Sequence, residues 1–146
     1  MTAKEYLQKI KRTRERIQSL EEQRAHIMST IGIKAIDYTA DRIRSSSDGD
    51  RMISAIARCV KIDNEIWQEK EHYIAQYRKV MKQIDGLDDS RYAELLKLRY
   101  IDDKRLEDIA CIMRRTDGST YSFDHILHMH GWALASFTEK YAKDIE

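Results

Sequence analysis

Three histidines lie within six positions near the C-terminus, at His125, His128 and His130. Imidazole nitrogens bind metal ions and carry protons, so the cluster raises three alternatives: a metal site, a catalytic base, or histidines with another role on a helix. On a helix, His125 and His128 share one face, and Asp124 lies four residues before His128. His130 points elsewhere, and neither cysteine is near in the sequence. Because a metal site needs three or four converging ligands, we expect no metal ion and no other cofactor.

No other motif in the chain is typical of an enzyme. The sequence has no glycine-rich phosphate loop, no nucleophile elbow and no carboxylate cluster on a recognisable scaffold. Cys59 and Cys111 are far apart and lack CxxC spacing, so we interpret both as small buried residues in a reduced compartment. We therefore expect no catalytic residue, and a binding protein rather than an enzyme.

The composition predicts an all-α protein. The 146 residues include no proline and only five glycines, and 35% of them are charged, which suits long helices that bury a single stripe. No apolar run reaches the length of a membrane span, and the polar N-terminus lacks a signal-peptide core. We expect a cytoplasmic protein of a bacterial host cell that has no membrane partner.

Two long helices should occupy residues 1–86. Thr2 and Glu5 form a capping-box pattern at the start of the first helix, predicted over residues 3–31, and Gly32 is a natural stop. Apolar residues recur along this helix with heptad-like spacing: Tyr6, Ile10, Ile17, Leu20, Ile27 and Ile31. Residues 33–50 lose this period. A second helix is predicted over residues 51–85, with one apolar stripe: Ile56, Val60, Trp67, Ile74, Tyr77, Met81 and Ile84.

A helix of about 50 Å cannot be covered by a small domain alone. It must pair with the first helix, with a second copy of itself, or with both. We expect a long antiparallel helical hairpin or coiled coil over residues 1–86, and a homo-oligomer built on residues 3–85.

Three shorter helices are predicted in residues 87–146, at about 90–101, 105–114 and 122–142. Asp88, Asp89 and Ser90 offer caps for the first of them. The other two form a helix-turn-helix pattern, in which small Ala110 allows close crossing and Ser122 caps the second helix. Leu106 and Met129 belong to the same apolar pattern, and Ile109, Met113 and Ile126 should fill the angle between the two helices. We expect these helices to form a second domain.

The sequence also resembles known transcription proteins. Residues 106–137, including the ending Ala133-Leu134-x-x-Phe137, are similar to the fourth conserved region of bacterial sigma factors. Three phrases resemble small phage proteins of the ArpU/RinA-like late-gene regulator family: SSSDGDRMISAIARCVKIDNEI (45–66), LKLRYIDDKRLEDIA (96–110) and HGWAL (130–134). The resemblance implies a DNA-binding regulator with a sigma-like helix-turn-helix behind a coiled-coil N-terminal part. It also implies a reading helix over residues 122–134, with His130 and Gly131 in its packed half.

Double-stranded DNA is therefore the expected partner, and late-gene promoters are the expected sites. On a helix capped at Ser122, the outward positions are the candidates for base contacts, and two arginines in the preceding turn are candidates for phosphate contacts. The predicted DNA-binding residues are Arg114, Arg115, Ser122, Phe123, Asp124, His125, Leu127 and His128.

Two features depart from the family pattern. The turn before Ser122 takes nine residues where relatives use about three. The reading helix has no Lys or Arg from Tyr121 to Glu139, and residues 87–146 hold 9 basic against 12 acidic residues, whereas residues 1–86 hold 17 against 13. Since phosphate neutralisation dominates DNA affinity, the alternative is a protein–protein adaptor that docks on host RNA polymerase through the sigma-like module. The basic stretch Lys4–Arg16 is a second candidate surface for nucleic acid.

Overall fold

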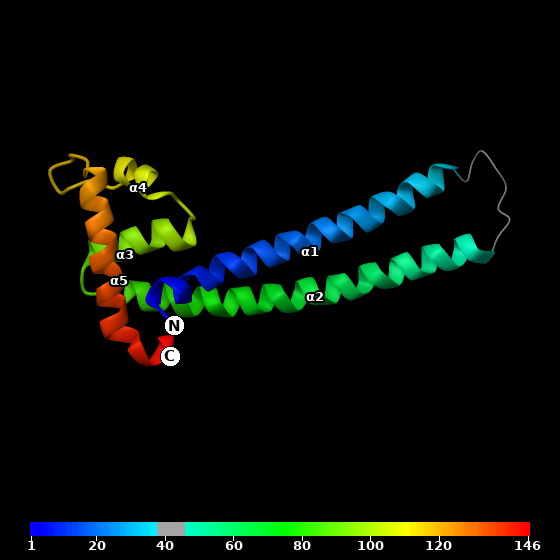
Figure 1. Cartoon of the computed structure of the whole chain (residues 1–146), viewed down its shortest axis with the longest axis horizontal. Coiled ribbons are helices and arrows are strands. Elements are labelled where there is room, and N and C mark those ends of the chain that lie inside the picture. The colour runs from blue at the N-terminus through cyan, green and yellow to red at the C-terminus, as the bar shows by residue number, and fades with distance from the viewer. Residues whose placement is uncertain (38–45) are drawn as a thin grey trace. The chain divides into compact units, whose positions relative to one another are not determined.

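The computed structural model describes the backbone of residues 1–37 and 46–146, and the side chains of residues 1–30 and 49–146. The described residues form an all-α protein, as predicted (Figure 1). The elements are α1 (Ala3–Asp37), α2 (Ser46–Asp85), α3 (Ser90–Leu96), the π-helical turn η1 (Lys97–Ile101), α4 (Leu106–Ile112) and α5 (Phe123–Ile145). No helix in this described part of the chain combines the length and the apolar character needed to cross a bilayer.

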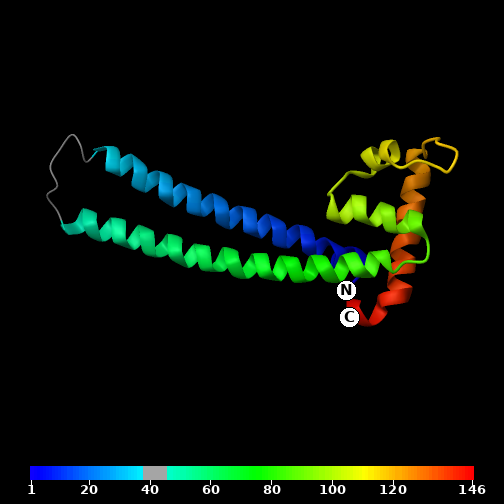
Figure 2. The same ribbon diagram turned by 180° about the vertical axis from the view of Figure 1, so that it is seen from behind.

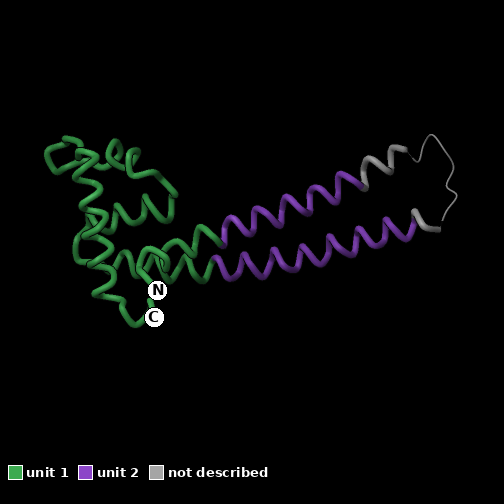
Figure 3. The backbone as a smooth tube through the Cα atoms, in the orientation of Figure 1, with its two compact units in different colours: residues 1–12, 74–146 green, residues 13–73 purple. Residues whose placement is uncertain are grey.

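The chain divides into two compact units, shown in different colours in Figure 3. Unit 1 contains residues 1–12 and 74–146, and unit 2 contains residues 13–73. The first turns of α1 therefore belong to the same compact unit as the three C-terminal helices. The domain boundary that we predicted at residue 86 stays a prediction.

In unit 1, α1 begins with the predicted capping box. The backbone N–H of Thr2 donates to the Glu5 carboxylate at 2.8 Å, and the Glu5 N–H donates to the Thr2 hydroxyl at 3.2 Å. The next turns pack into the unit, where the Tyr6 hydroxyl bonds Gln83 Oε1 at 3.0 Å on the last turns of α2. Figures 1 and 2 both show the two chain ends close together in this unit.

The C-terminal helices pack on α5. Asp89 caps α3 by accepting a hydrogen bond from the Arg91 N–H at 2.9 Å, as predicted. The helix predicted over residues 90–101 changes into the π-helical η1 at Lys97 and ends before Asp103, which has a φ of 54°. Fully buried apolar side chains from α1 to α5 form the core of the unit: Leu7, Ile10, Ile84, Leu95, Leu96, Ile109, Met113, Ile126, Met129 and Phe137.

In unit 2, the stretches of α1 and α2 run antiparallel, and ion pairs link them at intervals. Arg16 pairs with Glu69 at 3.0 Å, Glu21 with Lys70 at 2.9 Å, and Arg24 with Asp63. The residues buried here are mostly small or β-branched: Thr13, Ile17, Leu20, Ala55, Cys59 and Ile66.

The apolar stripe predicted on α2 is not the face of this helix that packs against α1 in unit 2. Ile56, Val60 and Trp67 are exposed, whereas Ala55, Cys59 and Ile66 are buried on the same helix. The hydropathy pattern favoured the bulkiest side chains. Two helices approach closely where the side chains between them are small, and Ala55 and Cys59 are small enough for this.

Helix boundaries also differ from the sequence pattern. α1 continues through Gly32 to Asp37, and α2 begins at Ser46, five residues before the predicted start. Residues 38–45, the middle of the connector predicted over residues 33–50, lie outside the described residues. A glycine inside a long helix costs only about 1 kcal/mol relative to alanine. The helical hydrogen bonds that form on both sides of Gly32 offset this cost.

Candidate nucleic-acid interface

The helix pair α4 and α5 is held by a shared apolar core. Ile109, Ala110 and Met113 from the end of α4 are buried, and so are Ile126 and Met129 from the first turns of α5. Ala110 is small enough to let the two helices approach closely. These are the residues that the sequence pattern placed between the two helices, and their burial fixes which face of α5 points outward.

The start of α5 is capped by Ser122. Its hydroxyl oxygen accepts a hydrogen bond from the His125 N–H at 3.1 Å, and Ser122 itself has extended backbone angles, as an N-cap requires. Phe123, Asp124 and Leu127 are exposed on the first two turns. The burial of the facing side chains thus leaves the N-terminal turns of α5 accessible to a partner.

The ten-residue connection between α4 and α5, residues 113–122, forms a small hairpin. Arg114 and Thr120 make an antiparallel bridge, and the Arg115 N–H donates to the Ser119 carbonyl at 2.8 Å. Gly118 has a φ of +85°, and the Asp117 carboxylate accepts bonds from both the N–H and the hydroxyl of Ser119. These bonds lower the pKa of Asp117. The insertion relative to the resembled family is therefore an ordered turn with its own hydrogen bonds.

The two arginines of this hairpin have different surroundings. Arg114 is exposed, but its guanidinium turns back to the end of α4 and donates to the Cys111 carbonyl at 2.5 Å. The Arg115 guanidinium carbon lies 4.8 Å from the centre of the Tyr121 ring. A guanidinium stacked on a ring keeps its N–H groups at the edge of the plane, where they can bind a phosphate. Arg115 is thus better placed for a phosphate contact than Arg114.

An aromatic row follows α5 beside these residues. The Tyr121 and His125 rings are 5.2 Å apart, and Trp132 lies 6.1 Å from both His125 and His128. His128 Nδ1 is 2.7 Å from the Asp124 carbonyl oxygen, one turn earlier on the helix. Trp132 is exposed and was not among the predicted DNA-binding residues, which end at His128. Its spacing of four residues from His128, which places both side chains on one helix face, could have indicated it.

His130 has a different role from the other two histidines. Its Nε2 atom is 2.9 Å from the Tyr100 hydroxyl of η1, and the ring is half-buried. Burial lowers the pKa of His130, and the nearby charges of Arg99 and Lys4 act in the same direction. His130 therefore holds η1 against α5. Its neighbour Gly131, which the resemblance places in the packed half of the helix, is exposed.

His125, His128 and His130 thus do not converge on one point. Among the residues that the structure describes, no group of three His, Cys, Asp or Glu side chains is arranged to hold a metal ion. Cys111 is exposed, contrary to our interpretation, and only Cys59 is buried. The expected absence of a metal stays a prediction.

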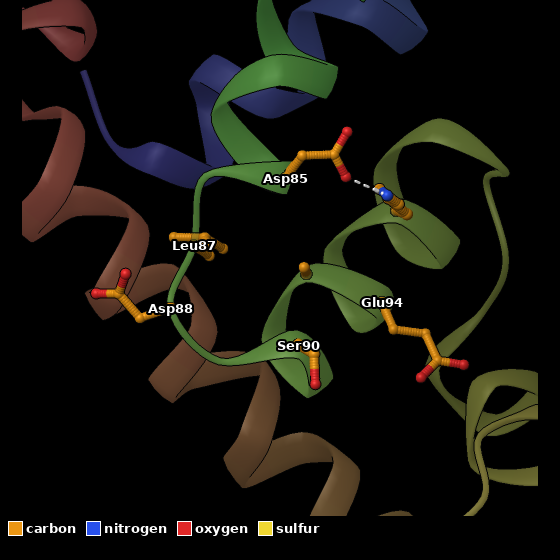
Figure 4. Close-up of a pocket in the computed structure, with 7 residues that line it drawn as sticks. Asp85, Leu87, Asp88, Ser90 and Glu94 are labelled. Carbon is orange, nitrogen blue, oxygen red and sulfur yellow. Dashed lines mark ion pairs between the residues drawn. The ribbon is translucent and has the colours of Figure 1, made fainter.

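A hollow lies between the end of α2 and α3 in unit 1 (Figure 4). Asp85, Asp88, Glu94 and Lys97 line it together with Leu87, Ser90 and Ala93. Lys97 forms an ion pair with Asp85, and Figure 4 shows the Asp88 and Glu94 carboxylates on opposite sides. These groups do not converge on a common point, so we locate the candidate site on α5.

Comparisons with known proteins found no relative of this chain. No family model, no curated protein and no solved structure matches this chain. The resemblance to phage regulators and sigma factors therefore rests on the sequence phrases given above.

Proposed function

We propose that the protein is a phage-type transcription regulator that binds promoter DNA of late genes through α4 and α5. The observation that supports this most directly is the buried contact between the two helices, which leaves the Ser122-capped end of α5 exposed. A helix-turn-helix presents its second helix to the major groove in this way, with the N-terminal residues nearest to the base edges. The antiparallel stretches of α1 and α2 would form the hairpin part of such a regulator.

The proposed contacts follow from exposure. Phe123 and Leu127 would contact thymine methyl groups, and His128 would bind a guanine edge. Arg115, stacked on Tyr121, would bind a backbone phosphate from the hairpin. With only one or two phosphate contacts in this unit, a single copy should bind weakly, and a steep salt dependence would require several copies on one site.

Binding to labelled late-promoter DNA at two salt concentrations tests the proposal. Arg115→Ala should weaken binding to all DNA and lower the slope of log affinity against log salt by about one. Lys143→Ala is the matched control, because it removes the same charge from the last turn of α5. Arg114→Ala is a poorer probe, since it also removes the bond to the Cys111 carbonyl. An unchanged salt slope in Arg115→Ala would reject the phosphate contact.

A base contact should show in sequence preference. His128→Ala should cost about 1–3 kcal/mol on the cognate site and nothing on unrelated DNA. The exposed His72 on α2 provides a control in His72→Ala. If His128→Ala and Arg115→Ala both bind DNA like the parent, α5 is not the reading helix, and the basic stretch Lys4–Arg16 becomes the nucleic-acid candidate.

A protein–protein adaptor is the second candidate, and the exposed apolar side chains of the same region favour it. Ile112, Phe123, Leu127 and Trp132 are large and more than two-fifths exposed. Aromatic and aliphatic residues of this kind form the centres of protein interfaces, whereas DNA surfaces are basic.

Binding to host RNA polymerase separates the two candidates. An adaptor predicts no DNA shift without the polymerase, and loss of polymerase binding in Leu127→Ser. Ile74→Ser is the control, because Ile74 is an exposed apolar residue elsewhere in unit 1. Binding to DNA alone, with a steep loss as salt rises, would support the regulator that reads DNA itself.

A further inference from the structure

In unit 2, α2 has a second apolar face that α1 does not cover. The relative exposed areas are 67% for Ile53, 46% for Ile56, 55% for Val60 and 63% for Trp67. Met52 is 42% exposed beside them. We call these five residues the α2 stripe. The residues of α2 that are buried against the antiparallel α1 stretch, such as Cys59 and Ile66, belong to a different face of the same helix.

The α2 stripe has the spacing of a coiled-coil seam. Ile53, Val60 and Trp67 are seven residues apart, and Ile56 follows Ile53 by three, so they occupy a and d positions. The uncharged residues Ala57 and Asn64 flank the stripe at e positions. In this register Asp63 occupies the d position after Ile56, and its carboxylate is already paired with Arg24 of α1. A helix that covered the stripe would therefore meet this carboxylate together with its counter-charge.

The exposed area suits a protein interface. From the fractions above, the stripe exposes on the order of 500 Å² in each copy, so two copies would bury about 1,000 Å². That total reaches the size at which a specific interface is expected, and crystal-type contacts are mostly below about 800 Å². A patch of this size lies in the range of about 300–600 Å² for the largest apolar patch of a monomer, and such patches often serve as binding sites.

We propose that a second copy of this chain covers the α2 stripe, with the two α2 helices antiparallel around a two-fold axis at Val60. The stripe is nearly symmetric about this residue, because Ile53 and Trp67 are each seven positions from it. The axis thus places Ile53 of each copy opposite Trp67 of the other, and Ile56 opposite Asn64. An isologous interface needs this self-complementarity. The small Val60 side chain lies where the two helices are closest.

Sedimentation equilibrium of the full chain over micromolar concentrations measures the expected dimer. Val60→Glu places two carboxylates at the axis and should raise the dimer dissociation constant about a hundredfold or more. His72→Glu is the matched control, since it adds a negative charge at an exposed α2 position five residues beyond Trp67 and outside the stripe, and it should leave the dimer intact. Trp67→Gln is the second variant and should weaken the dimer without introducing a charge. Circular dichroism checks that each variant keeps its helices.

Fluorescence of the Trp132→Phe variant then follows Trp67 alone, because the chain has two tryptophans. Its emission should shift to longer wavelength on dilution, in step with dissociation of the dimer. A chain that stays monomeric at 100 µM overturns the proposal. So does a dimer that tolerates both Val60→Glu and Trp67→Gln. A monomer whose Trp67 is shielded from a soluble quencher would place another segment of the same chain on the stripe, which also overturns it.

Discussion

At the scale of single residues, His130 shows how packing separates one histidine from its neighbours. Its bond to Tyr100 joins η1 to α5, and burial raises the pKa of Tyr100 to about 12, so the tyrosine stays protonated throughout the physiological range. When the neutral imidazole carries its proton on Nδ1, Nε2 accepts a hydrogen bond from the Tyr100 hydroxyl. Protonation of the ring would remove that acceptor and would place a charge beside Arg99 and Lys4.

The lowered pKa of His130 predicts a loss of stability in mild acid. The unfolded chain binds a proton at His130 near pH 6.5, and the folded chain binds it at lower pH. The free energy of unfolding should therefore be highest above pH 6.5 and should fall as the pH drops through the folded pKa of His130. Urea unfolding between pH 7.5 and 5.5 measures this, with His130→Gln as the comparison. Parallel pH curves for parent and variant would contradict the assignment.

The Tyr100 hydroxyl offers a second check on the same contact. Tyr100→Phe keeps the ring and removes one hydrogen bond in a half-buried site, so we expect a loss of about 1 kcal/mol in the free energy of unfolding. In the double variant with His130→Gln, the two losses should not add, because each removes the same bond. Full additivity in this double-mutant cycle would show that the two side chains do not interact.

At the scale of elements, the cap of α5 should have a measurable effect on stability. Ser122→Ala removes the oxygen that accepts the His125 N–H, so the free energy of unfolding should fall by about 1 kcal/mol. Thr116→Ala, at an exposed position of the preceding hairpin, is the control and should change it by less than about 0.5 kcal/mol. Thermal or urea unfolding measures both. Equal effects would mean that the cap contributes nothing.

Two glycines of the same region should respond to alanine with opposite signs. Gly118 has a positive φ, so Gly118→Ala should destabilise the hairpin by about 1 kcal/mol, although a Cβ there meets no atom within 4 Å. Gly131 lies inside α5 with open space around it, and Gly131→Ala should stabilise the protein by about 0.5–1 kcal/mol. Unfolding curves of the two variants give the comparison. A stabilised Gly118→Ala would contradict the hairpin geometry.

At the scale of the whole molecule, unit 1 is assembled from both ends of the chain. Leu7 is fully buried, and Lys11 pairs with Asp103 at 3.1 Å, so the first turns of α1 complete the core around α3 and α5. We expect Leu7→Ala to lower the free energy of unfolding by about 2–5 kcal/mol. Arg12→Ala, an exposed position in the same turns, should have little effect.

The same substitution tests how the N-terminal turns relate to the candidate site. If residues 1–12 stabilise the C-terminal helices, Leu7→Ala should speed hydrogen exchange of backbone amides in α5 as well as in α1. Exchange that rises in α1 alone would mean that the C-terminal helices are stable without the N-terminal segment.

Local patterns determined much of what is described above. The absence of proline and the helical period predicted an all-α chain, and caps at Thr2, Asp89 and Ser122 lie where the sequence placed them. Capping depends on a side chain and a backbone N–H two or three residues apart, so sequence alone is sufficient to locate it. The burial of Ile126, Ala133 and Phe137 also followed from the 3.6-residue period, which left the choice between Met129 and His130 open.

Only the tertiary structure determined which helix faces are buried and which side chains meet residues far away in the sequence. The exposed face and the buried face of α2 have the same helical period. Hydropathy therefore predicted Val60 and Trp67 on the apolar stripe, whereas close packing against α1 buries the smaller Ala55 and Cys59. The orientation of Arg114 toward a helix end and the contact of Tyr100 with His130 likewise depend on where the chain returns. Sequence period places residues on a helix face. Only the position of the neighbouring helices determines which face they cover, because burial is a property of the pair.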